Sequence, residues 1–249
     1  MKQTKILMGM PITVEITGDA IPPEIFEKVF NYFQHVDETF STYKEHSEIS
    51  KINKGGLTQK KASKEMQEVF ELSEQTKKET NGFFDIKNPS GQYDPSGLVK
   101  GWSIYNASKI LEAEGYKDYF IEAGGDIQTS RSNATAAPWK VGIRNPFNID
   151  EIVKVLAIKN EGVATSGTYI RGQHIYNPLE INSEVQEIVS LTVVGPNIYE
   201  ADRFATAAFA MGRNGISFIE NLKGFEGYMI DQQGIATMTS DFNKYIKNV

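Results

Sequence analysis

The order of helix-like and strand-like segments limits the possible folds of this 249-residue chain most strongly. Apolar residues recur at helical spacing from residue 25 to 36, directly after two prolines that suit the first turn of a helix. Further helices are predicted at about 63–79, 98–114, 199–211 and 215–222, and strands at 5–17, 117–123, 138–144, 153–159 and 188–194. Because helices and strands occur in blocks and do not alternate strictly, the pattern favours an α+β fold over a doubly wound parallel sheet.

Composition removes several classes of function. A net charge of −6 argues against electrostatic binding to nucleic acid or to an anionic membrane surface. The chain has no cysteine, which excludes disulfides, thiolate metal sites and a cysteine nucleophile. No run of about 18 apolar residues occurs, so no membrane span is expected. The first residues lack the apolar core and cleavage site of a secretory signal, and we therefore expect a cytoplasmic protein.

Two stretches combine glycine with charged residues. In Asp94-Pro95-Ser96-Gly97-Leu98-Val99-Lys100-Gly101, a helix start would present free amides to an anion, and Lys100 would add a charge. The alternative is that Asp94 or Ser96 only caps the helix. In Ala123-Gly124-Gly125-Asp126, the paired glycines allow either close approach of the backbone to a ligand or a plain hairpin turn.

Two further stretches carry hydroxyl groups. Residues 162–167, Gly-Val-Ala-Thr-Ser-Gly, are interpreted as a phosphate-handling loop with Arg171 and His174 behind it. The alternatives are a structural histidine and a simple turn at Asn177-Pro178. Asp202 and Thr206 are four residues apart and share one helix face, where their hard oxygen donors suit Mg²⁺ better than zinc. The alternative is a helix-start aspartate and a threonine bonded to its own turn.

Common catalytic signatures are missing from the sequence. The sequence contains no G-x-G-x-x-G dinucleotide-binding motif after a strand and no P-loop. It also contains no H-E-x-x-H zinc-protease motif and no G-x-S-x-G nucleophile elbow of the hydrolases. The three histidines, His35, His46 and His174, are too scattered to suggest a zinc cluster. These absences remove the commonest nucleotide, zinc-protease and hydrolase interpretations.

Eight short motifs, taken in order, resemble the FAD:protein FMN transferase family, also called the ApbE family. They are Met8-Gly9, FSTYKEHSEISKIN at 40–53, NGFFD at 81–85, DPSGLVKG at 94–101, AGGD at 123–126, GVATSG at 162–167, HIYNP at 174–178 and ADRFATAAFAMG at 201–212. The resemblance implies a single domain over residues 1–249, with two closely packed lobes, mixed or antiparallel sheets and flanking helices. It also implies a site in the crevice between the lobes.

The resemblance implies a specific reaction. Family members bind FAD and Mg²⁺, break the pyrophosphate, move FMN onto a threonine hydroxyl of an acceptor flavoprotein and release AMP. The acceptor's target motif would resemble Asp-Gly-x-Thr-Ser/Ala. Two alternatives stay open, namely an FAD pyrophosphatase that forms FMN and AMP, and a flavin-binding protein without turnover.

The resemblance also assigns roles to residues. The metal would be held by the side chains of Asp202 and Thr206 and by the carbonyl of Gly97, with Asp202 and His174 as the catalytic residues and His174 as the general base. The FAD site would contain Met8, Tyr43, Phe84, Asp85, Asp94, Lys100, Gly124, Gly125 and Ile175, with Thr165 and Ser166 near the phosphates.

This chain departs from the family pattern at two places. Only residues 86–93 separate NGFFD from DPSG, where many members carry a longer insert, which predicts a more open flavin pocket or a different acceptor surface. Asn177 stands where the family usually has an aspartate, which predicts weaker orientation of His174.

Overall fold

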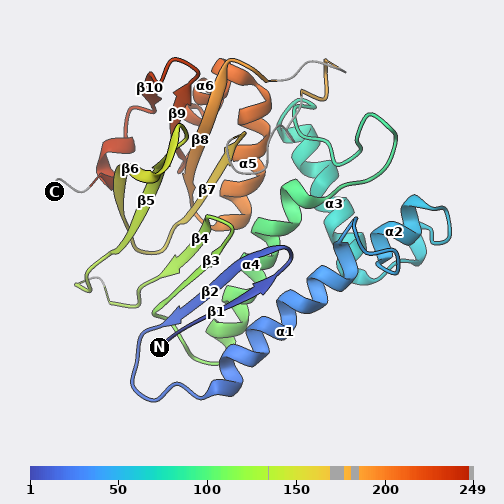
Figure 1. Ribbon diagram of the computed structural model, residues 1–249, viewed down its shortest axis with the longest axis horizontal. Helices are drawn as coiled ribbons and strands as arrows, with labels where there is room; N and C mark the ends of the chain where they lie inside the picture. Colours follow the sequence, from blue (N-terminus) through green and yellow to red (C-terminus); the bar gives the residue numbers. More distant parts are fainter. Residues whose placement is uncertain (134, 169–176, 181–184, 247–249) are drawn as a thin grey trace.

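The computed structural model describes residues 1–133, 135–168, 177–180 and 185–246. Within these residues, one sheet contains eight strands in the order β1-β2-β3-β4-β7-β8-β9-β10, and β5 and β6 form a separate two-stranded ribbon (Figure 1). All the strand pairs are antiparallel. The strands are β1 (Lys2–Leu7), β2 (Met10–Ile16), β3 (Tyr119–Ala123), β4 (Asp126–Ser130), β5 (Trp139–Asn145), β6 (Asn148–Ile158), β7 (Gly162–Gly167), β8 (Ile188–Gly195), β9 (Glu226–Asp231) and β10 (Ala236–Met238).

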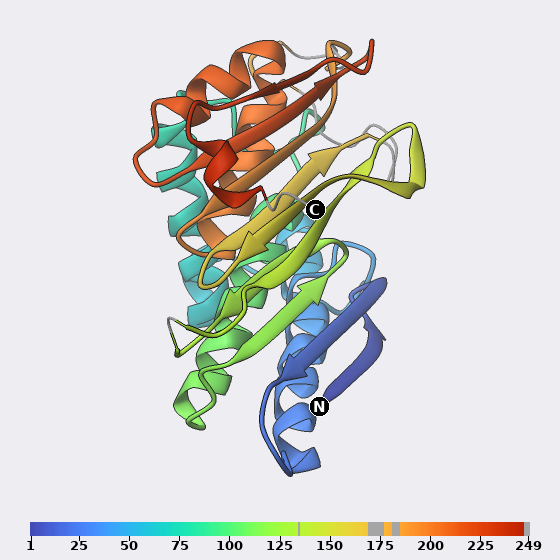
Figure 2. The ribbon, with the colours of Figure 1, turned by 90° about the vertical axis from the view of Figure 1, so that its left-hand side faces the viewer.

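Helices cover one face of the eight-stranded sheet, and the β5–β6 ribbon packs on the other face (Figures 1 and 2). The helices are α1 (Pro23–Phe40), α2 (Glu48–Asn53), α3 (Lys64–Glu79), α4 (Ser96–Ala113), α5 (Ile198–Ala210) and α6 (Gly215–Glu220), with short 3-10 turns η1 (Gln59–Lys61), η2 (Gly212–Asn214) and η3 (Phe242–Tyr245). The α+β class predicted from the order of the segments is therefore confirmed.

Three apolar clusters hold these layers together. The main core packs α1, α4 and α5 against the helix-facing side of the sheet. It includes Phe26 and Phe30 of α1, Ile121 of β3 and Leu191 of β8. A second cluster fills the space where the end of α1, α2, α3 and the start of α4 meet, around Phe40, Met66 and Trp102. A third lies between the other face of the sheet and the β5–β6 ribbon. Burial of this apolar surface is the main force that positions the helices.

Local sequence signals end several elements where they were predicted to end. Asn81 and Gly82 close α3, with the amide of Gly82 bonded to the carbonyl of Lys77 and that of Asn81 to Lys78. Gly124 and Gly125 form the two-residue turn of the β3–β4 hairpin, both with positive φ, as the mirror-image turns of hairpins require. The hairpin alternative for this glycine pair is confirmed.

The interpretation of residues 162–167 as a loop is wrong, because they form strand β7 in the middle of the sheet. Gly162 serves a close contact: a Cβ there would lie 2.1 Å from the amide nitrogen of Ile198 at the start of α5. Strand β4 was not predicted at all, since its sequence, Asp-Ile-Gln-Thr-Ser, has little apolar character. The strand is buried because neighbouring elements cover it, although most of its own side chains are polar.

None of the helices in the described part of the chain combines the length and the apolar character that crossing a bilayer requires.

Candidate active site

Helix α4 begins in the stretch that combines a turn, a glycine and a lysine. The carboxylate of Asp94 accepts a hydrogen bond from the amide of Ser96 at 3.0 Å, and the amides of Leu98 and Val99 bond to the carbonyl of Pro95. Asp94 therefore supports the helix start, close to the capping role considered for it. Lys100, one turn later, directs its ammonium group toward the sheet.

Lys100 joins a buried cluster of charges. Its Nζ lies 2.6 Å from Oδ2 of Asp126 on β4 and 3.9 Å from Oδ1 of Asp202 on α5. The side chains of the two aspartates are only 1% and 4% exposed. The other oxygen of each carboxylate accepts a backbone amide, that of Thr165 for Asp126 at 3.1 Å and that of Gly101 for Asp202 at 2.8 Å. Two buried carboxylates thus share one cation.

The surroundings of Asp202 disfavour its charged form. Burial raises the pKa of the Asp202 carboxyl, while the Lys100 ammonium lowers it and the Asp126 carboxylate raises it. The amide of Gly101 also acts to lower the pKa. The net direction is upward, because one lysine does not offset burial and a second carboxylate together.

Thr206 and Gly97 add two neutral oxygens beside this cluster. Thr206 lies one turn after Asp202 on α5, and its hydroxyl donates to the carbonyl of Gly97 on α4 at 3.4 Å. In the part of the chain that the structure describes, no three His, Cys, Asp or Glu side chains are grouped to hold a metal. An ion here would therefore rely on a hydroxyl and a carbonyl beside the carboxylate. Such an oxygen-only set, with excess negative charge next to it, fits Mg²⁺.

Glycines allow α4 and α5 to approach closely at the cluster. A Cβ at Gly101 would lie 2.6 Å from Cβ of Asp202 and 2.8 Å from the carbonyl of Ile198. A Cβ at Gly97 would lie 3.2 Å from the methyl group of Thr206. The two glycines, four residues apart on one helix face, therefore set the distance between the helix that carries Asp202 and the helix that carries Lys100.

A pocket of about 280 Å³ adjoins the charged cluster. Lys100 lines the pocket and its ammonium group belongs to the cluster, so this residue lies between the two. Tyr43 stands at the pocket with 96% of its surface exposed. Met8 lines it from the turn between β1 and β2, in a left-handed conformation (φ 53°) that is uncommon for a residue with a side chain. The lining residues are Met8, Gly9, Met10, Val36, Asp37, Phe40, Ser41, Thr42, Tyr43, Asp94, Ser96, Val99 and Lys100.

The loop that carries Tyr43 is anchored to the end of α1. The ammonium of Lys44 lies 2.6 Å from the carboxylate of Asp37 and 2.5 Å from that of Glu38. His46 contacts the second oxygen of Glu38 at 2.5 Å. Hydrogen bonds to Asp37 and then to Glu38 raise the pKa of Lys44, so the lysine is charged at neutral pH. These contacts hold the loop while the ring of Tyr43 remains exposed.

The structure brings together Met8, Tyr43, Asp94 and Lys100 in the pocket, and Lys100, Asp202, Thr206 and Gly97 in or beside the cluster. Phe84 is buried and packs next to Gly97. The Asp85 carboxylate lies outside the pocket lining and accepts hydrogen bonds from Lys77 at 2.6 Å and from the amide of Lys87.

Four further residues predicted for the FAD site, Gly124, Gly125, Thr165 and Ser166, lie in different elements of the sheet. Gly124 and Gly125 lie in the β3–β4 turn. Thr165 shares a sheet face with Val163, on the ribbon side away from α5, and its hydroxyl bonds to that of Thr192 at 2.9 Å. Its neighbour Ser166 is buried on the opposite face. Only one of these two hydroxyls can therefore face the helices.

His174, Ile175 and Arg171 lie outside the described residues. Asn177 is described, and its side-chain oxygen accepts the amide of Leu179 at 3.0 Å, which confirms the turn predicted at Asn177-Pro178.

Sequence reasoning missed Asp126. This residue ends the Ala-Gly-Gly-Asp motif, of which only the glycines were assigned to the site. The available signal was an acidic residue directly after a tight turn, at the start of a segment with few apolar side chains. The structure shows why it matters, because Asp126 is the closest partner of Lys100 among the two aspartates.

Comparisons with known proteins identify the family of this chain. The model of the ApbE family matches residues 8–90 and 87–229. The FAD:protein FMN transferase of Escherichia coli (strain K12) is 27% identical over 155 residues, which are 59% of this chain and 44% of that protein. The FAD:protein FMN transferase of Buchnera aphidicola subsp. Baizongia pistaciae is 32% identical over 132 residues, which are 50% of this chain and 39% of that protein. These alignments span less than half the length of either transferase.

Solved structures share the whole fold. The ApbE protein of Thermotoga maritima superimposes with a TM-score of 0.86 at 18% identity, over 100% of this chain and 99% of that one. The flavin transferase ApbE from Vibrio cholerae gives a TM-score of 0.84 at 20% identity, over 98% of each chain. Since the family model covers most of the sequence, this chain belongs to the ApbE family.

Proposed function

We propose that this chain is a Mg²⁺-dependent FAD:protein FMN transferase, which moves FMN from FAD onto a threonine hydroxyl of an acceptor flavoprotein and releases AMP. The observation that carries the proposal is that one residue, Lys100, lines an aromatic-walled pocket and also pairs with the carboxylates of a buried cluster of oxygen donors. Relatives that carry the name FAD:protein FMN transferase, with 27% and 32% identity, support the same activity.

The pocket suits a flavin nucleotide. The exposed ring of Tyr43 offers a face on which the isoalloxazine can stack, and Met8 and Val99 add apolar surface. Lys100, at the boundary with the charged cluster, brings a positive charge toward the diphosphate. The ion pairs of Lys44 anchor the loop at residues 41–47 that carries Tyr43, so that little loop entropy is lost on binding.

The charged cluster would hold the metal. Asp202, Thr206 and the carbonyl of Gly97 would be the ligands, and Asp126 would add negative charge behind Lys100. When bound, Mg²⁺ would neutralise the charge that develops on the diphosphate oxygens as the bond breaks. The protein's own part is to fix the oxygens, since the amide of Gly101 orients Asp202 and the hydroxyl of Thr206 is directed at Gly97. His174 remains our candidate for the general base that takes the proton of the acceptor threonine.

The proposal is tested by incubating the protein with FAD, MgCl₂ and an acceptor carrying the motif Asp-Gly-x-Thr-Ser/Ala, followed by intact mass analysis. We expect the acceptor to gain the mass of one FMN phosphoester and AMP to appear in equal amount. Formation of FMN and AMP with an unmodified acceptor would instead identify a pyrophosphatase. Bound FAD without any AMP would identify a flavin-binding protein.

A further inference from the structure

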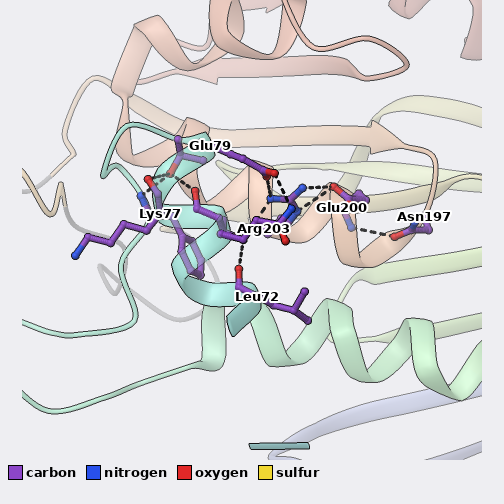
Figure 3. Close-up of polar contacts among 10 residues, drawn as sticks. Leu72, Lys77, Glu79, Asn197, Glu200 and Arg203 are labelled. Carbon is purple, nitrogen blue, oxygen red and sulfur yellow. Dashed lines mark hydrogen bonds and ion pairs between the residues drawn. The ribbon is translucent and has the colours of Figure 1, made fainter. Parts of the chain in front are cut away.

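Arg203 directly follows Asp202 on α5, and its guanidinium group is buried among polar contacts (Figure 3). The side chain is only 5% exposed. Its Nε and Nη2 donate to one oxygen of Glu200 at 2.9 and 2.5 Å, and its Nη1 donates to Glu79 and to the hydroxyl of Thr76. The carboxylates on two sides satisfy the donors of this buried arginine, and losing either carboxylate would leave buried guanidinium N–H groups without an acceptor.

The two carboxylates differ in what they connect. Glu200 lies on α5 itself, three residues before Arg203, so this pair joins one helix to itself. Glu79 is the last residue of α3, and Thr76 lies one turn earlier, so these contacts join α5 to the end of α3. Figure 3 shows the guanidinium between the two helices. Only the contacts with α3 can fix the position of one helix relative to the other.

The end of α3 leads directly to the candidate metal ligands. The hydroxyl of Thr80 donates to the carbonyl of Thr76 at 2.7 Å and accepts the amide of Phe84 at 3.2 Å, which holds the turn after the helix. The ring of Phe84 lies 3.6 Å from the position that a Cβ of Gly97 would take. The carbonyl of Gly97 in turn accepts the hydroxyl of Thr206.

These contacts link α5 to itself through two other elements. Arg203 on α5 contacts the end of α3, the Thr80–Phe84 turn connects the end of α3 to Gly97 on α4, and Gly97 contacts Thr206 on α5. The two candidate ligands on α5, Asp202 and Thr206, flank Arg203 in sequence. Metal ligands need supporting contacts that fix their orientation, and Mg²⁺ demands nearly ideal octahedral geometry.

We propose that the Arg203–Glu79 pair is a positioning tether, which sets the distance between the Gly97 carbonyl and the Asp202 and Thr206 oxygens and thereby tunes metal affinity. The tether rests on the proposed function, because it assumes a metal at these oxygens. Neither Arg203 nor Glu79 contacts the metal in this scheme. Both act through the Thr80–Phe84 turn.

The test compares two truncations at the same guanidinium, Glu79→Ala and Glu200→Ala. The probe is Mn²⁺, titrated in the presence of FAD and followed by electron paramagnetic resonance of the free ion, so that no turnover is needed. We expect Glu79→Ala to weaken Mn²⁺ binding about tenfold, the low end of the losses seen when a supporting contact of a metal ligand is removed. Glu200→Ala, which leaves the link to α3 in place, should change binding less than about twofold. A Glu79→Gln variant should restore part of the affinity, because its amide can still accept from Arg203.

Thr80→Val provides a second, independent measurement. It removes the hydroxyl that holds the Phe84 turn but keeps the shape of the side chain, and it should weaken Mn²⁺ binding in the same direction as Glu79→Ala. It decides the question alone if Glu79→Ala does not fold. Equal Mn²⁺ affinity in the Glu79 and Glu200 variants, or an unchanged Thr80→Val protein, would overturn the tether while the wild type still binds metal. A wild-type protein that binds no Mn²⁺ would overturn the metal site of the proposed function itself, and the tether with it.

Discussion

Asp126 and Asp202 share the ammonium group of Lys100, which lies 2.6 Å from the first carboxylate and 3.9 Å from the second. The two aspartates come from β4 and α5, far apart in the sequence, and both are almost fully buried. One lysine cannot neutralise two carboxylates, so this point carries excess negative charge whenever both aspartates are ionised. Such an arrangement costs stability unless a further cation or a proton compensates it.

The first prediction follows from this imbalance. Replacing Asp202 by Asn removes the excess charge, while the amide oxygen can still accept from Gly101. We expect the metal-free variant to melt at the same temperature as the wild type or higher, and to lose the stabilisation by Mg²⁺ completely. Transfer activity should fall by about 100-fold or more, as when a group that stabilises transition-state charge is lost. Thermal melting with and without MgCl₂ measures the first two effects, and a metal-free variant that melts well below the wild type would contradict them.

The second prediction concerns pH. Because the folded-state pKa of Asp202 is raised, the folded metal-free protein holds a proton that the unfolded chain loses near pH 4. The stability contribution of this group is therefore complete below that pH and decreases as the pH rises toward the folded-state pKa. Stabilisation by Mg²⁺ should increase over the same range, since the ion competes with the proton. Urea unfolding at several pH values checks this, and the Asp202→Asn variant should lack both trends.

Part of the structure could be predicted from local signals. Helices α1 and α3 have clear apolar periodicity, the prolines mark the start of α1, and the Gly124-Gly125 pair predicted a hairpin. Strand β7 could not be recognised, because its glycines and hydroxyls serve close packing against α5 and bonds to β8, which only the tertiary fold creates. The same holds for Asp126, whose role depends on Lys100 reaching it from another element.

The site was predicted best where the relevant residues lie close together in the sequence. Asp202 and Thr206 are on one helix face, and their spacing alone placed them together. The sequence order of Thr165 and Ser166 could not show that strand geometry sends their side chains to opposite faces. Whether either hydroxyl lies near the phosphates stays a prediction.

The third prediction tests the anchored loop at residues 41–47. Lys44→Met removes the ion pairs to Asp37 and Glu38 but keeps roughly the length of the side chain, so the loop that carries Tyr43 should lose its anchor to α1. We expect FAD binding, measured by quenching of flavin fluorescence, to weaken by about tenfold, which corresponds to the cost of ordering one or two side chains. The rate at saturating FAD should change little.

A matched control for that experiment is Lys54→Met. Lys54 lies in the same region, but among the described residues its one ion pair is with the exposed Glu45, at 3.6 Å, and this pair does not involve α1. Exposed pairs of this kind contribute little, so FAD affinity should stay within about twofold of the wild type. Equal losses in the two variants would show that net charge, and not the anchoring of Tyr43, sets the affinity.

The fourth prediction turns on the sign of a stability change at Gly101. In an open helix position, Gly→Ala stabilises a protein by about 0.5–1 kcal/mol. Here a Cβ would lie 2.6 Å from Cβ of Asp202 and 2.8 Å from the carbonyl of Ile198, neither of which belongs to a flexible side-chain end.

We therefore expect Gly101→Ala to lower the free energy of unfolding by about 1–3 kcal/mol, as overpacking does, and to weaken Mg²⁺ binding because Asp202 must move. Gly97→Ala, whose closest contact would be 3.2 Å to the methyl group of Thr206, should cost less. Urea unfolding decides between the two signs. A stabilised Gly101→Ala protein would mean that α4 and α5 can separate without cost, and the distance between Lys100 and Asp202 would then not be fixed by the crossing of these helices.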